Sequence, residues 1–178
     1  MYSQIIDFWF AELDPKQWWE KDFELDSMIK KRFGELHDKA RRGELFQWRA
    51  TAKGCLAEII ILDQFSRNIY RDKPESFASD PLALVLAQYA ITKGFDIELS
   101  ETERSFLYLP FMHSESKLIH LEAIKLYEAL GNPSNLDFEH KHKVIIDRFG
   151  RYPHRNDILG RISSADEVEF LKQPNSRF

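Results

Sequence analysis

Apolar residues recur along most of this chain at the spacing of an α-helix. Between residues 23 and 42, Leu25, Ile29 and Phe33 follow one another at intervals of four, as on one face of an amphipathic helix. Similar patterns elsewhere end at glycine, proline or a capping residue, which are ordinary signals for helix ends. They predict about eight helices, over residues 3–12, 23–42, 51–70, 80–93, 100–109, 114–130 and 137–149 and from Ser164 onwards.

The ends of these helices carry specific signals. Asp80 suits the N-cap position, because Pro81 follows at the first helical position and Gly94 stands just beyond the expected end. Residues 100–103 and 164–167 each fit the capping box, in which a serine and a glutamate cap each other's backbone.

Two prolines are expected to end helices. Leu109-Pro110 closes the helix that begins at Ser100, and Asn132-Pro133 follows the helix over 114–130. The next helix is then expected to begin near Asp137.

Two short apolar runs, 59–63 and 144–147, also permit a different interpretation as buried strands that end in an aspartate. No other β-rich run is present to pair with them, and no glycine-rich phosphate loop follows either one. We therefore expect an all-α protein. The sequence contains no linker and no low-complexity stretch, so we expect one domain over residues 1–178.

The composition excludes several functional classes. The 178 residues include 25 Lys and Arg against 29 Asp and Glu, a net charge of −4, which argues against a general nucleic-acid-binding protein. The longest near-apolar run, 59–62, is far shorter than the roughly 20 residues of a transmembrane helix. The first ten residues contain Asp7 and no basic residue, unlike a signal peptide. We expect a cytoplasmic protein with no membrane or nucleic-acid partner, and predict no oligomeric state.

Metal and nucleophile motifs are missing from the sequence. The single cysteine, Cys55, excludes an internal disulfide and a cysteine-based zinc site. No His-Glu-x-x-His and no Gly-x-Ser-x-Gly motif occurs. His140 and His142 would point to different helix faces. We therefore expect no metal and no cofactor.

A polar arc follows the apolar first half of the helix expected over 51–70. On a regular helix its members would lie within an arc of about 140°. They are Asp63, Gln64, Arg67, Asn68 and Arg71. This arrangement fits a core helix that reaches a cleft. It fits equally a salt-bridged helix end, because Asp63 and Arg67 are four residues apart.

A basic segment lies near the C-terminus, with six Lys and Arg against two Asp between residues 140 and 161. Arg151, His154 and Arg155 are expected on a loop stiffened by Pro153. Arginine forks suit carboxylate or phosphate groups, and a histidine among arginines tends to stay neutral and able to accept a proton. The alternative is a structural loop whose arginines tie helix ends together.

Two further features remain open to two interpretations. Residues 61–67 resemble 145–151, either by chance or because two similar helical hairpins deliver matching polar groups. His113 is expected at the start of a helix, with Ser114 as its N-cap and Glu115 favourable to the helix dipole. His113 then belongs either to a site or to simple capping chemistry.

Three blocks resemble the signature of a known family: LDQFSRNIYRD (62–72), ERSFLYLPFMHSE (103–115) and HKVIIDRFGRYPHRNDILGR (142–161). They are similar to the domain-of-unknown-function 924 family, which implies a tetratricopeptide-like stack of antiparallel helix pairs and brings no assigned activity. The residues in its motifs are Asp63, Gln64, Arg67, Asn68, His113, Glu115, His142, Arg148, Arg151, His154, Arg155 and Asn156. Of these, we expect Asp63, His142 and His154 to be catalytic and the others to bind the ligand.

Two functional hypotheses follow. In the first, the polar arc and the 151–156 loop face one cleft that binds a small phosphate- or carboxylate-bearing ligand, with or without acid–base chemistry. Arg67, Arg151 and Arg155 would hold the anion, Asn68 and Asn156 would orient it, and His142 or His154 with Asp63 would handle a proton. In the second, a helical scaffold binds an acidic peptide in an open groove without catalysis.

Overall fold

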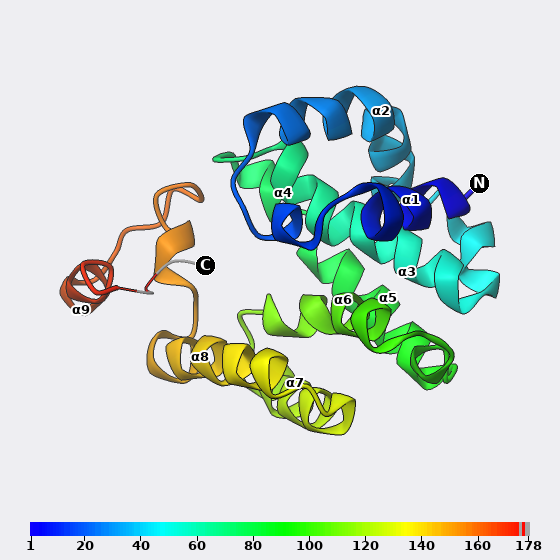
Figure 1. Ribbon diagram of the computed structural model, residues 1–178. Coiled ribbons are helices and arrows are strands. Elements are labelled where there is room, and N and C mark those ends of the chain that lie inside the picture. The colour runs from blue at the N-terminus through cyan, green and yellow to red at the C-terminus, as the bar shows by residue number, and fades with distance from the viewer. Residues whose placement is uncertain (175, 177–178) are drawn as a thin grey trace.

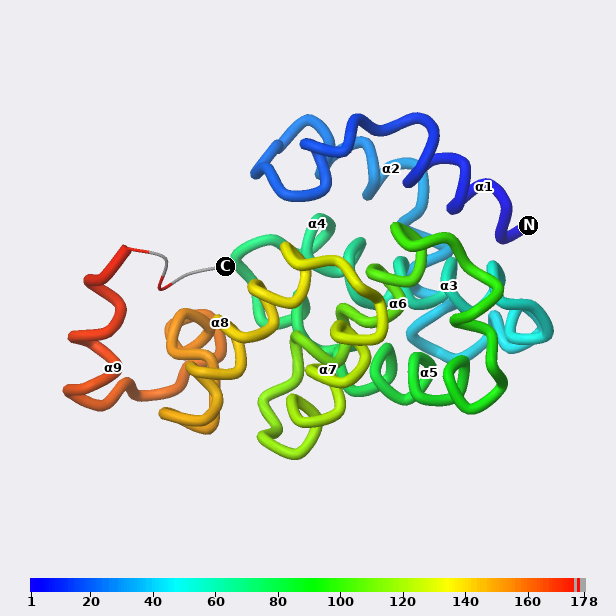
Figure 2. Tube along the Cα trace, turned by 60° about the horizontal axis from the view of Figure 1, so that its bottom comes forward, coloured from blue at the N-terminus to red at the C-terminus, as the bar shows by residue number. Residues whose placement is uncertain are grey.

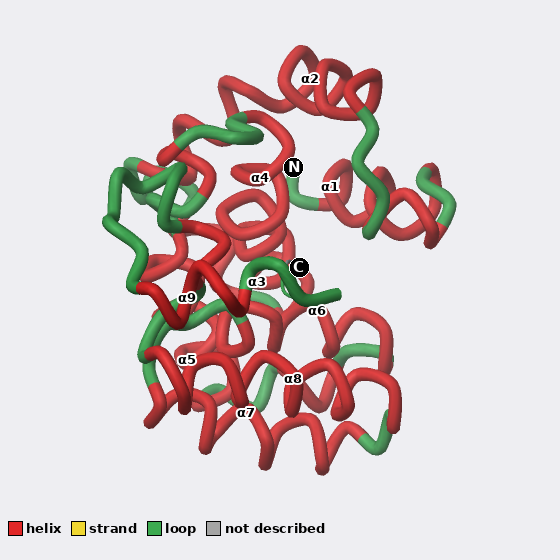
Figure 3. The backbone as a smooth tube through the Cα atoms, turned by 90° about the vertical axis from the view of Figure 1, so that its left-hand side faces the viewer, coloured by secondary structure: helices red, strands yellow, loops and turns green. Residues whose placement is uncertain are grey.

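The computed structural model describes residues 1–174 and 176, and throughout these residues the chain forms helices and loops without a strand (Figure 3). The α-helices are α1 (Ser3–Asp7), α2 (Phe23–Arg41), α3 (Ala52–Ile60), α4 (Ser66–Ile69), α5 (Asp80–Thr92), α6 (Glu101–Met112), α7 (Lys117–Leu130), α8 (Pro133–Phe149) and α9 (Ala165–Phe170). Short π or 3-10 turns occupy Phe8–Glu12, Pro15–Trp18, Phe46–Ala50, Ile61–Phe65, Pro74–Ser76, Asp96–Glu98 and Pro153–Arg155. The all-α prediction is confirmed.

Helix α3 lies at the centre of the fold, and α1, α5 and α6 pack against it (Figure 1). Helices α5, α6, α7 and α8 pack successively, each against the next (Figure 2). Helix α9 lies at the edge of the molecule, beyond the end of α8. No described helix has both the length and the apolar composition needed to cross a membrane.

The main core is built from apolar faces that meet around α3 and its continuation. Phe8, Phe33 and Phe65 come from three separate segments, and their ring centroids lie 4.9–6.0 Å apart. Helix α3 is buried almost all round, as its largely apolar composition predicts. Burying a large apolar side chain stabilises the fold by roughly 1.5–3 kcal/mol. This burial fixes the position of the polar residues that follow α3.

The helix predicted over 51–70 contains a π turn at Ile61–Phe65, between α3 and α4. A π turn changes the angular register of the side chains that follow it. The predicted polar arc therefore divides in two. Arg67 turns toward Asp80, at the start of α5, whereas Asn68 and Arg71 both bond to Asp26 of α2.

Three predicted helix boundaries differ from the structure by more than one residue. Pro110 lies inside α6, which continues to Met112; the backbone N–H of His113 still bonds to the carbonyl of Leu109. A proline near the end of a helix removes one hydrogen bond without stopping the last turn. Helix α7 begins after Ser116, not after Ser114.

Helix α8 begins at Pro133, four residues before the predicted start, because Asn132 is its N-cap. The Asn132 side chain accepts hydrogen bonds from the backbone of Ser134 and Asn135. Proline is well suited to the first helical position, where its missing N–H would have no partner. The two predicted capping boxes, at 100–103 and 164–167, are confirmed.

Candidate functional site: a buried cluster around His113

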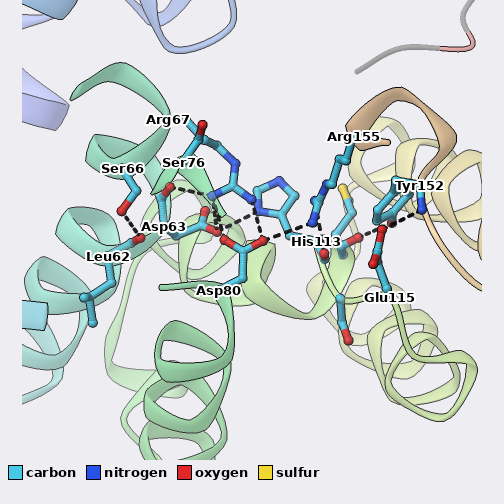
Figure 4. Close-up of polar contacts among 12 residues, drawn as sticks. Leu62, Asp63, Ser66, Arg67, Ser76, Asp80, His113, Glu115, Tyr152 and Arg155 are labelled. Atoms are coloured by element: carbon cyan, nitrogen blue, oxygen red, sulfur yellow. Dashed lines mark hydrogen bonds and ion pairs between the residues drawn. The ribbon is translucent and has the colours of Figure 1, made fainter. Parts of the chain in front are cut away.

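The π turn and the end of α6 bring Asp63 and His113 into contact. Nδ1 of His113 lies 2.7 Å from Oδ1 of Asp63, which is only 1% exposed (Figure 4). The side-chain amide of Gln64 donates to Oδ2 of the same carboxylate. Nη1 of Arg67 lies 3.2 Å from Oδ1 of Asp63 and donates to the Asp63 carbonyl at 2.6 Å. The carboxylate thus has partners on both oxygens.

The surroundings set the charge states of this pair. Burial by itself would raise the pKa of the Asp63 carboxyl, but Arg67 and His113 hold that pKa well below its usual range. Burial lowers the pKa of the His113 imidazole, and the charge of Arg67 acts in the same direction against the opposing effect of Asp63. His113 is therefore neutral near pH 7, and the hydrogen on Nδ1 is donated to Asp63.

The other ring nitrogen of His113 is available. No hydrogen bond to Nε2 of His113 is formed by the described residues, and the side chain is 15% exposed. With Nδ1 as donor, Nε2 carries a lone pair and accepts a proton or a hydrogen bond.

Asp80 joins the two arginines of the cluster. Its carboxylate accepts from both terminal nitrogens of Arg67, at 3.1 and 3.2 Å, and from Nη1 of Arg155 at 3.1 Å. The prediction that Asp80 is an N-cap is wrong, because Ser79 holds that position and Asp80 is the first residue of α5. We call Asp63, Arg67, Asp80, His113 and Arg155 the His113 cluster.

The two arginines differ in accessibility. The Arg155 side chain is 7% exposed and stacks between Phe77 and Tyr152, with its guanidinium carbon 4.5 and 4.7 Å from the two ring centroids. The Arg67 side chain is 21% exposed. Arg155 therefore serves mainly to hold the cluster together, and Arg67 is the guanidinium that solvent reaches more easily.

Side chains also hold the backbone around His113. The carbonyl of Met112 accepts from the Tyr152 hydroxyl at 2.5 Å, and the carbonyl of His113 accepts from Nη2 of Arg155 at 3.1 Å. The carbonyl of Ser114 accepts from Nε2 of His120 at 2.8 Å. Three successive carbonyls are thus each held by a different side chain. These bonds fix the backbone that carries the His113 ring.

The loop after α8 is tied to the same turn. Arg161 makes a bidentate pair with Glu115, at 2.6 and 2.9 Å, and the backbone N–H of Tyr152 donates to Glu115 at 2.7 Å. Nε of Arg161 donates to Asn156 at 3.0 Å. Glu115 and Asn156, both predicted ligand-binding residues, hold the loop in place.

His142 and His154 lie around Tyr152. Their ring centroids are 5.7 and 5.5 Å from that of Tyr152. Nδ1 of His142 donates to the Phe138 carbonyl at 2.7 Å, and burial lowers the pKa of His142 to about 3, so its ring stays neutral. The histidine that contacts Asp63 is His113, whereas the sequence analysis assigned proton handling to His142 or His154.

Three more of the residues predicted to bind the ligand have their contacts elsewhere in the molecule. Asn68 bonds to Asp26 at 2.8 Å, and Arg151 pairs with Glu167 of α9 at 2.6 Å. Arg148 is exposed, with its guanidinium carbon 4.6 Å from the centroid of the Phe149 ring.

The likeness between residues 61–67 and 145–151 has no functional counterpart. Asp63 is buried in the His113 cluster, whereas Asp147 is 46% exposed and pairs with Lys143. Sequence reasoning also missed Asp80, Tyr152, His120 and Arg161 as parts of the site. Each has at least one partner far along the chain, namely Arg155 for Asp80, Met112 for Tyr152, Glu139 for His120 and Glu115 for Arg161, so no local pattern pointed to them.

Neither a metal nor a reactive cysteine stands out. Among the described residues, no group of three or more His, Cys, Asp and Glu side chains is placed to hold a metal ion. Burial raises the pKa of the Cys55 thiol to about 11, which makes it a poor nucleophile.

Two surface grooves lie away from the cluster. One, of about 550 Å³, is lined by residues of α7 and α8, including Leu121, Ile124 and Val144. The other, of about 410 Å³, is lined by residues that include Phe46, Val85 and Tyr89.

The fold and the site define an all-helical protein with an internal cluster of paired charges around one accessible histidine. The chain belongs to the family described as bacterial protein of unknown function (DUF924), whose model matches residues 5–175. A solved structure, that of the protein of unknown function ATU0120 from Agrobacterium tumefaciens, is 38% identical with a TM-score of 0.92, over 96% of each chain. No curated protein matches this chain. Nothing in these comparisons supports the expected tetratricopeptide-like relationship.

Proposed function

We propose that the His113 cluster binds a small anion and that His113 exchanges a proton with it or with a bound water. The observation that carries this proposal is the Asp63–His113 pair, 2.7 Å apart, in which Nε2 has no hydrogen bond from a described residue. A carboxylate that fixes the tautomer of an imidazole is the usual arrangement of a histidine general base.

The charge balance explains why the ligand would be an anion. Asp63 and Asp80 balance Arg67 and Arg155, so the cluster without ligand is neutral while His113 is neutral. An arriving anion would stabilise the imidazolium form of His113, which adds one positive charge. Arg67, the more accessible arginine, lies beside His113; its Nη1 already donates to Asp63 and Asp80 and its Nη2 once to Asp80, so it offers a carboxylate or a phosphate its Nε–H and the second hydrogen of Nη2. Binding would then take up a proton.

The peptide-binding alternative has weaker support. The larger groove is lined by Lys125 and Lys143. These lysines already pair with Glu122 and Asp147, which line the same groove. A groove whose cations are balanced by its own acids offers little attraction to an acidic peptide.

Residue-specific NMR with inorganic phosphate and with succinate tests this proposal. We expect either anion to shift the His113 ring signals and raise the pKa of His113, with tighter binding at pH 6 than at pH 8. Binding is followed in each variant by the backbone amide signals of Asp63 and Asp80, and His113→Gln should lose the tighter binding at pH 6. His140→Gln, which changes an exposed histidine elsewhere on α8, should keep it.

The two anions separate the ligand classes: a response to phosphate alone favours phosphate esters, and a response to succinate alone favours carboxylates. The proposal is wrong if neither anion moves the His113 signals between pH 6 and pH 8. It is also wrong if His113→Gln binds the anion more tightly at pH 6 than at pH 8, as the wild type does.

A further inference from the structure

A second carboxylate–histidine pair contacts the turn at residues 112–114, which we call the His113 turn. His120 of α7 and Glu139 of α8 are both 0% exposed, and Nδ1 of His120 lies 2.7 Å from Oε1 of Glu139. On the other side of the ring, Nε2 lies 2.8 Å from the Ser114 carbonyl. The pair thus connects α8 to the residue that follows His113.

The hydrogen-bond partners determine how many protons this pair carries. A carbonyl oxygen only accepts, so Nε2 of His120 must carry a hydrogen. If Nδ1 and the Glu139 oxygen were both bare, two lone pairs would face each other at 2.7 Å. One further proton must therefore lie between them. The pair holds one proton more than a neutral histidine beside a free carboxylate.

Burial favours the same number of protons on the His120–Glu139 pair. With the extra proton the pair is neutral overall, whereas without it a negative charge would remain in the interior. Oε2 of Glu139 is buried and has no hydrogen-bond partner among the described residues, so that charge would be poorly stabilised. Burial raises the pKa of the Glu139 carboxyl, consistent with retention of the proton.

We propose that His120 and Glu139 are positioning residues for His113, which share one proton so that His120 donates to the Ser114 carbonyl and holds the turn. This inference rests on the proposed function of the His113 cluster. The pair does not touch a ligand itself; it acts through the backbone on the C-terminal side of His113.

Loss of the shared proton would rearrange the hydrogen bonds on both sides of His113. The one remaining ring hydrogen of His120 would then be on Nδ1, where it is donated to the Glu139 carboxylate, and Nε2 would become an acceptor. The Ser114 carbonyl then loses its donor. The Tyr152 hydroxyl, which donates to Met112, lies 3.3 Å from Nε2 of His120 and could donate there instead.

Other titratable groups surround the pair and must be followed separately. Those that interact with it from α7, α8 and the following loop are Tyr127, His140, His142, Lys143 and Tyr152. His142 stays neutral, because burial lowers its pKa to about 3, and burial raises the pKa of Tyr127 well above its usual value. A probe that reports on each histidine separately is therefore needed.

The ring nitrogens of 15N-labelled histidine in the free protein give that probe. We expect Nε2 of His120 to carry a hydrogen at pH 7. Because burial raises the pKa of the Glu139 carboxyl, we also expect the His113 signals to shift at high pH, when the pair loses its shared proton. In Glu139→Gln the amide donates to Nδ1 and does not titrate, so His120 keeps the same tautomer and the shared high-pH step disappears. Glu122→Gln, an exposed change on α7, should behave as wild type.

A bare Nε2 on His120 at pH 7 overturns this inference without any variant. It is also overturned if the His113 signals follow the same pH profile in wild type and in Glu139→Gln. The proposed function can fail separately. If Nε2 of His120 carries a hydrogen but His113 responds to neither phosphate nor succinate, there is no anion site, and the proton assignment of His120 still holds. A response to either anion with a bare Nε2 removes only the positioning role.

Discussion

Oδ1 of Asp63 lies 2.7 Å from Nδ1 of His113, although 50 residues separate the two in the chain. The π turn after α3 carries the carboxylate and the C-cap of α6 carries the imidazole. Each shifts the pKa of the other, so this contact links the stability of the fold to the protonation of His113.

Asp63→Asn should lower both the stability and the pKa of His113. Removing one partner of a buried ion pair costs about 3–5 kcal/mol, because Arg67 loses part of its compensation. The imidazolium form of His113 also loses its nearest negative charge, so the pKa falls further below its usual value. Urea unfolding and an NMR titration measure the two effects. Asp147→Asn, at an exposed aspartate, should stay within about 0.5 kcal/mol of wild type.

Arg155→Ala should destabilise the protein without ligand by about 3–5 kcal/mol, because Asp80 loses a buried partner and the His113 carbonyl loses a donor. Arg155→Lys should recover only part of this loss, since an ammonium group cannot bond to both acceptors through a planar fork or stack as well between Phe77 and Tyr152. Urea unfolding measures each variant. Arg148→Ala is the matched control, and an equal loss there would contradict this assignment.

Two glycines should respond to alanine in opposite directions. Gly34 lies inside α2, and an added Cβ would meet nothing within 4 Å, so Gly34→Ala should stabilise the protein by about 0.5–1 kcal/mol through helix propensity. At Gly54 the added Cβ would lie 1.9 Å from the Trp48 carbonyl oxygen, so Gly54→Ala should be strongly destabilising. Thermal unfolding of both variants checks the pair. A destabilised Gly34→Ala would contradict this prediction, because it would mean that the added methyl group clashes with a neighbour.

Acidification should destabilise the fold partly through His37. His37 is buried and bonded to Ser66 at 2.8 Å, and burial lowers its pKa from 6.5 to about 4. The unfolded chain therefore binds this proton at higher pH than the folded protein does, and stability is lost as the pH falls from about 6.5 to about 4.

Urea midpoints at pH 7, 6, 5 and 4 should decrease for wild type, and less steeply for His37→Gln, which cannot titrate. His140→Gln, which replaces an exposed histidine, is the control variant. Equal slopes for wild type and His37→Gln would show that His37 does not contribute.

The order of the helices, most of their bounds and both serine capping boxes could be predicted because these features depend on neighbours within about four residues. The same local patterns gave wrong boundaries at Pro110 and Asn132. Pro110 lies in the last turn of α6, and Pro133 is the first residue of α8. A helix accepts proline at both places, so the local pattern alone does not fix the boundary.

The sequence by itself determined an all-helical chain with a polar arc after a buried helix and a polar loop near residue 155, and it predicted that both face one cleft. Arg67 of the arc approaches the loop, whereas Asn68 and Arg71 bond to Asp26, and neither of the two grooves described is lined by residues of the His113 cluster. It did not determine the partners. Arg67 and Arg155 meet on Asp80, and His113 rather than His142 or His154 contacts Asp63. Only the packing of α5 and α6 against α3 and its π turn decided these contacts, because each joins residues too far apart in the chain for helical periodicity to relate them.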